Sequence, residues 1–84
     1  MPVISMFYGI IIQMFFNEHN PPHFHAQYQD FKAMFDLKGN LMNGDMPNRQ
    51  KRLIAAWAEI HHDELVANWE LAKINALVKI EPLR

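Results

Sequence analysis

The chain has 84 residues, a net charge of −1 and no cysteine, and 50% of its residues are hydrophobic. This length suits one domain and not two, and the apolar content argues against disorder. The lack of cysteine fits a reducing compartment, and the charge lacks the positive excess of non-specific nucleic-acid binding. We therefore expect a single cytoplasmic domain over residues 1–84. Nucleic acid as a partner is not indicated by its net charge.

The hydropathy of the chain predicts no membrane association. No apolar run approaches the ~20 residues of a membrane span, and the first residues lack the basic region of a signal peptide. The apolar and aromatic residues are nevertheless numerous for so short a chain. We expect some of this surface to be buried against a second copy, as a homodimer, or against another protein.

The first half of the sequence has the pattern of β-strands. Residues 10–16 are β-branched and aromatic and too few for a typical helix, and residues 3–7 form a similar run. Residues 23–29 and 31–37 alternate between apolar and polar side chains, with Asp30 at the position of a tight turn. A further short strand is predicted at residues 41–42, between two turn signals.

The second half of the sequence has helical periodicity. Apolar residues recur at helical spacing over residues 53–60 and again over residues 65–76. Asp45 is suited to cap a first helix and Asp63 a second, while one bent helix fits the same stripe. Because strands precede helices, we expect an α+β fold. It comprises an N-terminal antiparallel sheet of three to five strands and two C-terminal helices, or one bent helix, packed on one face.

Four segments carry a resemblance to a known family: ISMFYGI at residues 4–10, HNPPHFHAQY at 19–28, WAEIHHDELVANW at 57–69 and KIEPL at 79–83. Over essentially its whole length the chain resembles a family of small prokaryotic proteins known as domain-of-unknown-function family 4160. The resemblance implies no activity, since the family has no settled one. It does imply a cognate partner, because members are often encoded beside another small uncharacterised protein, as in a toxin–antitoxin pair.

The histidine cluster is the chemically unusual feature of the sequence. His23 and His25 lie two residues apart on a predicted strand, so their side chains project from the same face with Cβ atoms about 6–7 Å apart. His19 can close over the pair as a third ligand, or Glu18 or Asp36 can take the place of one histidine. Three protein ligands with one open position suit a divalent metal such as zinc.

The same histidines are compatible with two other roles. Imidazoles can act as general base and general acid in RNA cleavage, with a cation stabilising the developing charge on phosphorus. The candidate catalytic residues are then His19, His23 and His25, with Arg49 or Arg52 as the cation. In the alternative, the imidazoles lie at the rim of the sheet and hydrogen-bond to turn carbonyls.

Two functions from different classes follow from these features. The favoured one is a small regulatory protein-interaction module, one component of a toxin–antitoxin-like gene pair, which forms a homodimer or binds the neighbouring gene product. The alternative is a small histidine-dependent hydrolase in the form of a ribonuclease toxin. The sequence therefore leaves open whether the protein is an enzyme.

Overall fold

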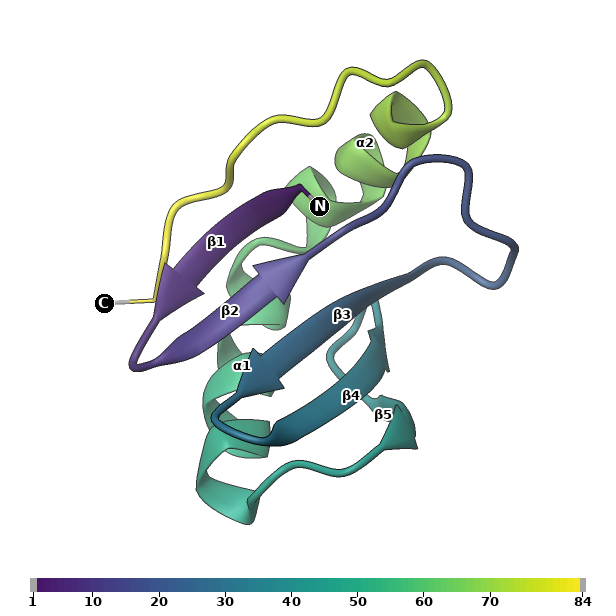
Figure 1. Cartoon of the computed structure of the whole chain (residues 1–84). Helices are drawn as coiled ribbons and strands as arrows, with labels where there is room; N and C mark the ends of the chain where they lie inside the picture. Colours follow the sequence, from purple (N-terminus) through teal and green to yellow (C-terminus); the bar gives the residue numbers. More distant parts are fainter. Residues whose placement is uncertain (1, 84) are drawn as a thin grey trace.

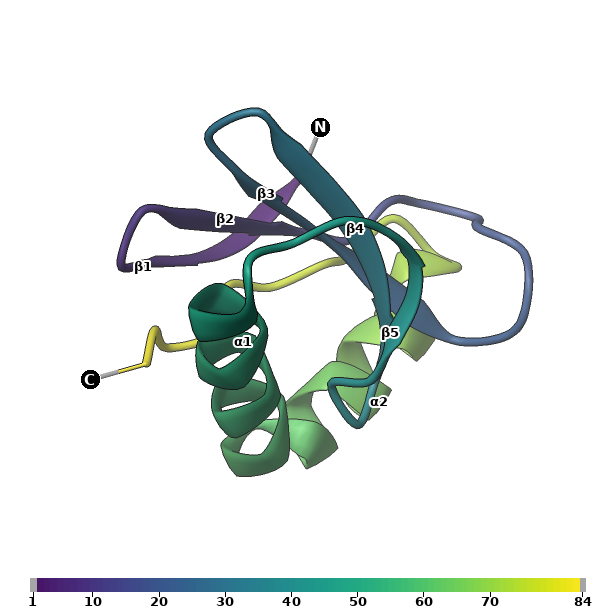
Figure 2. The same ribbon diagram turned by 90° about the horizontal axis from the view of Figure 1, so that it is seen from below.

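The structure, a computed structural model, describes residues 2–83. Five strands form one antiparallel sheet in the order β1-β2-β3-β4-β5 (Figure 1): β1 (Val3–Phe7), β2 (Ile10–Gln13), β3 (His23–Tyr28), β4 (Phe31–Asp36) and β5 (Leu41–Gly44). Two helices follow, α1 (Asn48–Ile60) and α2 (His62–Ala72), and both lie against the same face of the sheet (Figure 2). The predicted α+β class and the order of strands and helices are confirmed.

The β3–β4 hairpin follows directly from the alternating sequence. Tyr28 pairs with Phe31, so the strands are joined by a two-residue turn at residues 29–30, as the sequence predicted. Phe24 lies opposite Phe35, and their stacked rings, with centroids 5.7 Å apart, are both buried on the helix side of the sheet. Because side chains alternate along a strand, the apolar residues of β3 and β4 lie on this face of the sheet and form part of the core.

Trp57 of α1 joins the helices to the sheet. Its side chain is fully buried, and its ring lies 5.4 Å from that of Phe7 and 5.6 Å from that of Phe24. Its indole N–H donates a hydrogen bond to the carbonyl oxygen of Glu81 at 2.8 Å. A buried tryptophan that also satisfies its polar atom is a strong anchor, which agrees with its predicted place on an apolar helical stripe.

The two helices are separated by a single residue, His61. The backbone N–H of His61 donates to Trp57 and its carbonyl accepts from Leu65, so the backbone hydrogen bonds continue through the bend. The predicted caps are wrong: Pro47 precedes α1 with no side-chain cap, and Asp63 lies inside the first turn of α2. Neither α1 nor α2 is long and apolar enough to cross a membrane.

The segment after α2 covers one edge of the sheet. The fully buried amide of Asn68 donates to the carbonyl of Val78 at 2.8 Å and accepts from its N–H at 3.0 Å. The N–H of Ile80 then donates to the carbonyl of Ile4 at 2.7 Å, so the segment runs beside β1 (Figure 1). The opposite edge differs, because β5 pairs only with β4 among the described residues and all four of its residues are exposed.

Replacing Asn68 by alanine should detach the segment around Val78 from α2. Loss of two partly buried hydrogen bonds removes the protein partner of both backbone groups of Val78, at a cost of about 1–3 kcal/mol in the free energy of unfolding. Asn48→Ala, at an exposed asparagine of α1, is the control and should change stability by no more than about 0.5 kcal/mol. Urea unfolding followed by tryptophan fluorescence measures both. Equal midpoints for the two variants would contradict this role of Asn68.

Candidate functional site

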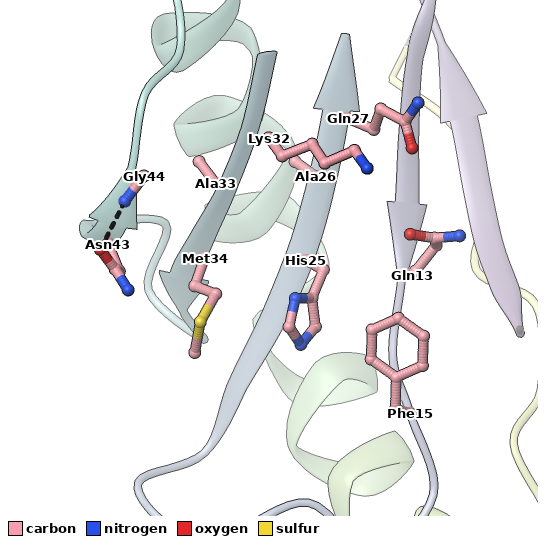
Figure 3. A pocket seen from close by; sticks show the side chains of 10 residues that line it. All are labelled: Gln13, Phe15, His25, Ala26, Gln27, Lys32, Ala33, Met34, Asn43 and Gly44. Atoms are coloured by element: carbon pink, nitrogen blue, oxygen red, sulfur yellow. Dashed lines mark hydrogen bonds between the residues drawn. The ribbon is translucent and has the colours of Figure 1, made fainter. Parts of the chain in front are cut away.

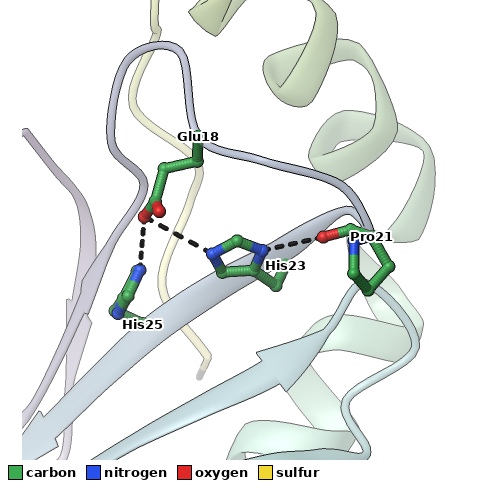
Figure 4. A network of polar contacts seen from close by, with 4 residues as sticks. All are labelled: Glu18, Pro21, His23 and His25. Carbon is green, nitrogen blue, oxygen red and sulfur yellow. Dashed lines mark hydrogen bonds and ion pairs between the residues drawn. The ribbon is translucent and has the colours of Figure 1, made fainter.

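Glu18, His23 and His25 come together where the loop after β2 returns to the start of β3 (Figure 4). The Nε2 atom of His25 lies 2.6 Å from Oε1 of Glu18, and Nε2 of His23 lies 3.4 Å from the same oxygen. One potential ligand atom from each residue lies within 4.8 Å of the other two. The side chains of Glu18 and His25 keep about a quarter of their surface exposed, so solvent reaches the group from that side.

His23 is held in a fixed orientation by its surroundings. The residue is only 4% exposed, and its ring lies 5.3 Å from Trp69 of α2 and 5.1 Å from His25. Its Nδ1 lies 2.8 Å from the carbonyl oxygen of Pro21, which can only accept, so Nδ1 carries a proton. Nε2 is buried and has no hydrogen-bond partner among the described residues. In the neutral ring, the lone pair of Nε2 therefore points toward Glu18.

The local sequence explains this arrangement. His23 and His25 share a face of β3 because side chains alternate along a strand, while Phe24 between them enters the core. Residues 17–22 then fold back over the start of the strand. Asn17 adopts a positive φ of 56°, a conformation that asparagine tolerates better than most residues and that lets the chain reverse after β2. This reversal brings Glu18 above the two imidazoles.

The pKa of the Glu18 carboxyl depends on the two histidines beside it, His23 and His25. Its partial burial alone would raise its pKa, because desolvation disfavours the charged form. The hydrogen bond from His25 and the positive charge that His25 and His23 can carry outweigh this effect, so the pKa of Glu18 lies below its ordinary value. Glu18 is thus held as a carboxylate.

The other residues singled out in the sequence lie elsewhere. His19 is exposed and does not belong to the Glu18–His23–His25 group. The carboxylate of Asp36 accepts hydrogen bonds from the N–H groups of Lys38 and Asn40, both at 2.9 Å, and so closes the β4–β5 turn. Arg49 is exposed in the first turn of α1, and Figure 1 places the start of α1 at the opposite end of the molecule from the 17–22 loop.

A cavity of about 420 Å³ opens beside His25 on the face of the sheet that the helices leave uncovered (Figure 3). Its rim combines three side-chain amides with one lysine and two apolar side chains: Gln13, Gln27, Asn43, Lys32, Phe15 and Met34. The ring of Phe15 meets that of His25 edge to face, with centroids 4.5 Å apart. Sequence analysis missed this cavity, although the alternation of β3 and β4 already placed Gln27, Lys32 and Met34 on the face of His25.

A family model described as a domain of unknown function, DUF4160, matches residues 9–70. The chain belongs to this family. No curated protein and no solved structure matches the chain. The matched region of this DUF4160 chain extends from the start of β2 into α2, and therefore contains Glu18, His23, His25 and Trp69.

The geometry of this DUF4160 site limits its chemistry. Of its two imidazoles, only that of His25 is partly open to solvent, since His23 is enclosed by Trp69 and the 17–22 loop. Two solvent-accessible imidazoles, one base and one acid, are therefore not present in the group. What it offers is a carboxylate and two imidazole nitrogens that converge on one point.

Stability should depend on Glu18 in a pH-dependent way. Because folding lowers the pKa of Glu18, its carboxylate stabilises the fold above the unfolded pKa of about 4.3, and this contribution is lost as the pH falls through the lower, folded pKa. We expect Glu18→Gln to lower the free energy of unfolding by up to about 1 kcal/mol near neutral pH, with the difference vanishing in acid. Urea titrations at several pH values measure it.

The control for this experiment is Glu59→Gln, at an exposed glutamate of α1. It should track the wild type at every pH. A Glu18→Gln protein as stable as the wild type across the whole range would show that the carboxylate contributes nothing at this position.

Proposed function

We propose that this DUF4160 chain is a small cytoplasmic regulatory module that binds a cognate protein, as one component of a toxin–antitoxin-like pair. The observation that carries the proposal is the open edge of the sheet. All four residues of β5 are exposed, and two of them, Leu41 and Met42, are large apolar residues that are 42% and 39% exposed. Native proteins normally blunt an edge strand with charges, proline or a covering segment.

One edge of the sheet is covered by another segment of the chain and the other is not, which supports β5 as the docking site. The β1 edge carries the segment around Ile80, whose N–H donates to Ile4. The β5 edge has no such cover among residues 2–83, and no charged residue or proline lies within it; its one irregularity among the described residues is the register shift at Met42. An extended segment of a partner can add there as a sixth strand, with main-chain hydrogen bonds supplying affinity and apolar contacts supplying specificity.

Leu41 and Met42 also fit the proposed partner. Met34 pairs with Asn43 and Phe35 with Leu41, so Met42 is unpaired at an irregularity of the β4–β5 ladder. Both apolar side chains are exposed along this edge, where an added strand would contact them. Further apolar side chains are exposed just after β2 and on the helices, including Phe16, Ile60 and Val66. The number of such side chains in so short a chain is the reason to propose a protein as the ligand of this surface.

Met42→Lys should block this interaction. A lysine on an edge strand disfavours the addition of another strand, so we expect the affinity for the cognate neighbouring protein to fall at least about tenfold. Co-expression followed by co-purification and calorimetry measures this. Met6→Lys is the matched control, since Met6 is 62% exposed on β1, at the edge already covered, and should bind as the wild type does. Equal loss in both variants, or in neither, would refute the β5 docking site.

A hydrolase remains the second candidate, because one contact favours it. Glu18 accepts a hydrogen bond from His25 at 2.6 Å, a carboxylate–imidazole pair that can orient a general base, and His25 borders the cavity that contains Lys32. Lys32, and not the Arg49 expected from sequence, is then the cation next to the substrate.

Expression of His25→Ala separates the two candidates if the wild type arrests growth. The interaction module predicts that the variant still arrests growth, because His25 lies outside β5. A variant that folds, by circular dichroism, and has lost the growth arrest together with cleavage of cellular RNA would favour the ribonuclease instead. His19→Ala, which changes an exposed histidine of the neighbouring loop, is the control and should stay active under both functions.

A further inference from the structure

We propose that Glu18, His23 and His25 bind a divalent transition-metal ion, and that zinc is the ion their donor atoms fit. This inference goes beyond the proposed interaction function, because β5 and the loop over β3 are different parts of the molecule. It replaces His19 by Glu18 in the ligand set that the sequence suggested.

The first support is the unpartnered nitrogen of His23. Its Nε2 is buried, lacks a hydrogen-bond partner among the described residues, and lies 3.4 Å from Oε1 of Glu18. A buried polar atom without a partner is unfavourable, and in the neutral ring its lone pair faces a carboxylate, which adds an electrostatic penalty. A metal ion between the two atoms removes both penalties at once, and the zinc titration below distinguishes it from a proton on Nε2.

The second support is the contact on the far side of the same ring. Nδ1 of His23 donates to the carbonyl of Pro21 at 2.8 Å. Histidines that bind metals commonly donate their other ring N–H to a carbonyl or carboxylate, which fixes the tautomer and the orientation of the ring. Pro21 therefore holds Nε2 in the state and direction that a metal ligand needs.

The distances between donor atoms also fit a small ion. Zinc binds imidazole nitrogen and carboxylate oxygen at about 2.0–2.2 Å, and tetrahedral angles then place the ligand atoms about 3.3 Å apart. The separation of Glu18 Oε1 from His23 Nε2 is already 3.4 Å, and all three donor atoms lie within 4.8 Å of one another. The shorter contact between Glu18 and His25, 2.6 Å, would open by less than an ångström.

Binding changes the protonation of His25 and leaves one position open. Coordination through Nε2 requires His25 to be neutral with its proton on Nδ1. Because protons compete with the ion for the imidazole and carboxylate donor atoms, affinity falls as the pH is lowered. With two imidazoles and one carboxylate as ligands, a fourth position remains for water on the solvent side, where Glu18 and His25 are partly exposed.

Calorimetric titration of the tag-free full chain with zinc chloride near neutral pH tests the proposal. We expect one ion per chain for the wild type, and an affinity at least about tenfold lower for Glu18→Gln and for His25→Gln. His19→Gln is the matched control, because it removes an imidazole from the same loop outside the group, and it should bind as tightly as the wild type. Magnesium should give no binding, since it prefers oxygen ligands.

Several results would overturn the proposal. These are a wild type that binds no zinc at millimolar concentration, variants of Glu18 and His25 that bind as the wild type does, or a His19→Gln protein that loses binding to the same extent. Circular dichroism establishes that each variant is folded. Should His25→Gln fail to fold, Glu18→Gln decides the question alone, because Glu18 lies in a loop outside the sheet and the core.

Discussion

The alternation of side chains along β3 is the constraint on which both the core and the candidate site depend. Phe24 and Ala26 are buried on the helix side, while His25 borders the cavity on the uncovered side of the sheet and His23, at the start of the strand, is buried against Trp69. A shift of one residue in register would exchange Phe24 with the histidines and place His25 in the core. The packing of Phe24 against Phe35 and Trp57 therefore also fixes where the histidines point.

The candidate metal site and the proposed docking edge are linked by the uncovered face of the sheet. The cavity beside His25 extends across β3 and β4 as far as Asn43 and Gly44 of β5 (Figure 3). A strand added to β5 would border this cavity, and an ion held by Glu18 would fix the loop at its other end. Binding of protein and of metal would then act on opposite ends of one surface, with His25 at the metal end.

Sequence reasoning succeeded where the pattern is local. Period two over residues 23–37 predicted β3, β4 and their turn, and helical spacing predicted a helical second half, while leaving open two helices or one bent helix. The predicted cap at Asp45 failed because α1 begins only at Asn48, after Pro47, and the Asp45 carboxylate accepts a hydrogen bond from the N–H of Met46 instead of one from the first turn of the helix. Which backbone N–H an aspartate side chain binds cannot be predicted from the hydropathy pattern.

The site was predictable only in part, for a related reason. The common direction of His23 and His25 follows from strand geometry alone. The choice of Glu18 over its neighbour His19 depends on the path of the 17–22 loop, which has no periodicity, and the remoteness of Arg49 depends on where α1 packs. Lys32 and Phe15 were missed because their proximity to His25 requires the pairing of three strands.

The most direct test of the Glu18–His23–His25 site is a crystal structure of the chain grown with zinc, with diffraction data collected on both sides of the zinc absorption edge. We predict an anomalous peak bounded by Nε2 of His23, Nε2 of His25 and the carboxylate of Glu18, with the Nδ1 contact of His23 to Pro21 retained. A crystal with no peak at this position, or with zinc held by His19 instead of Glu18, would contradict it.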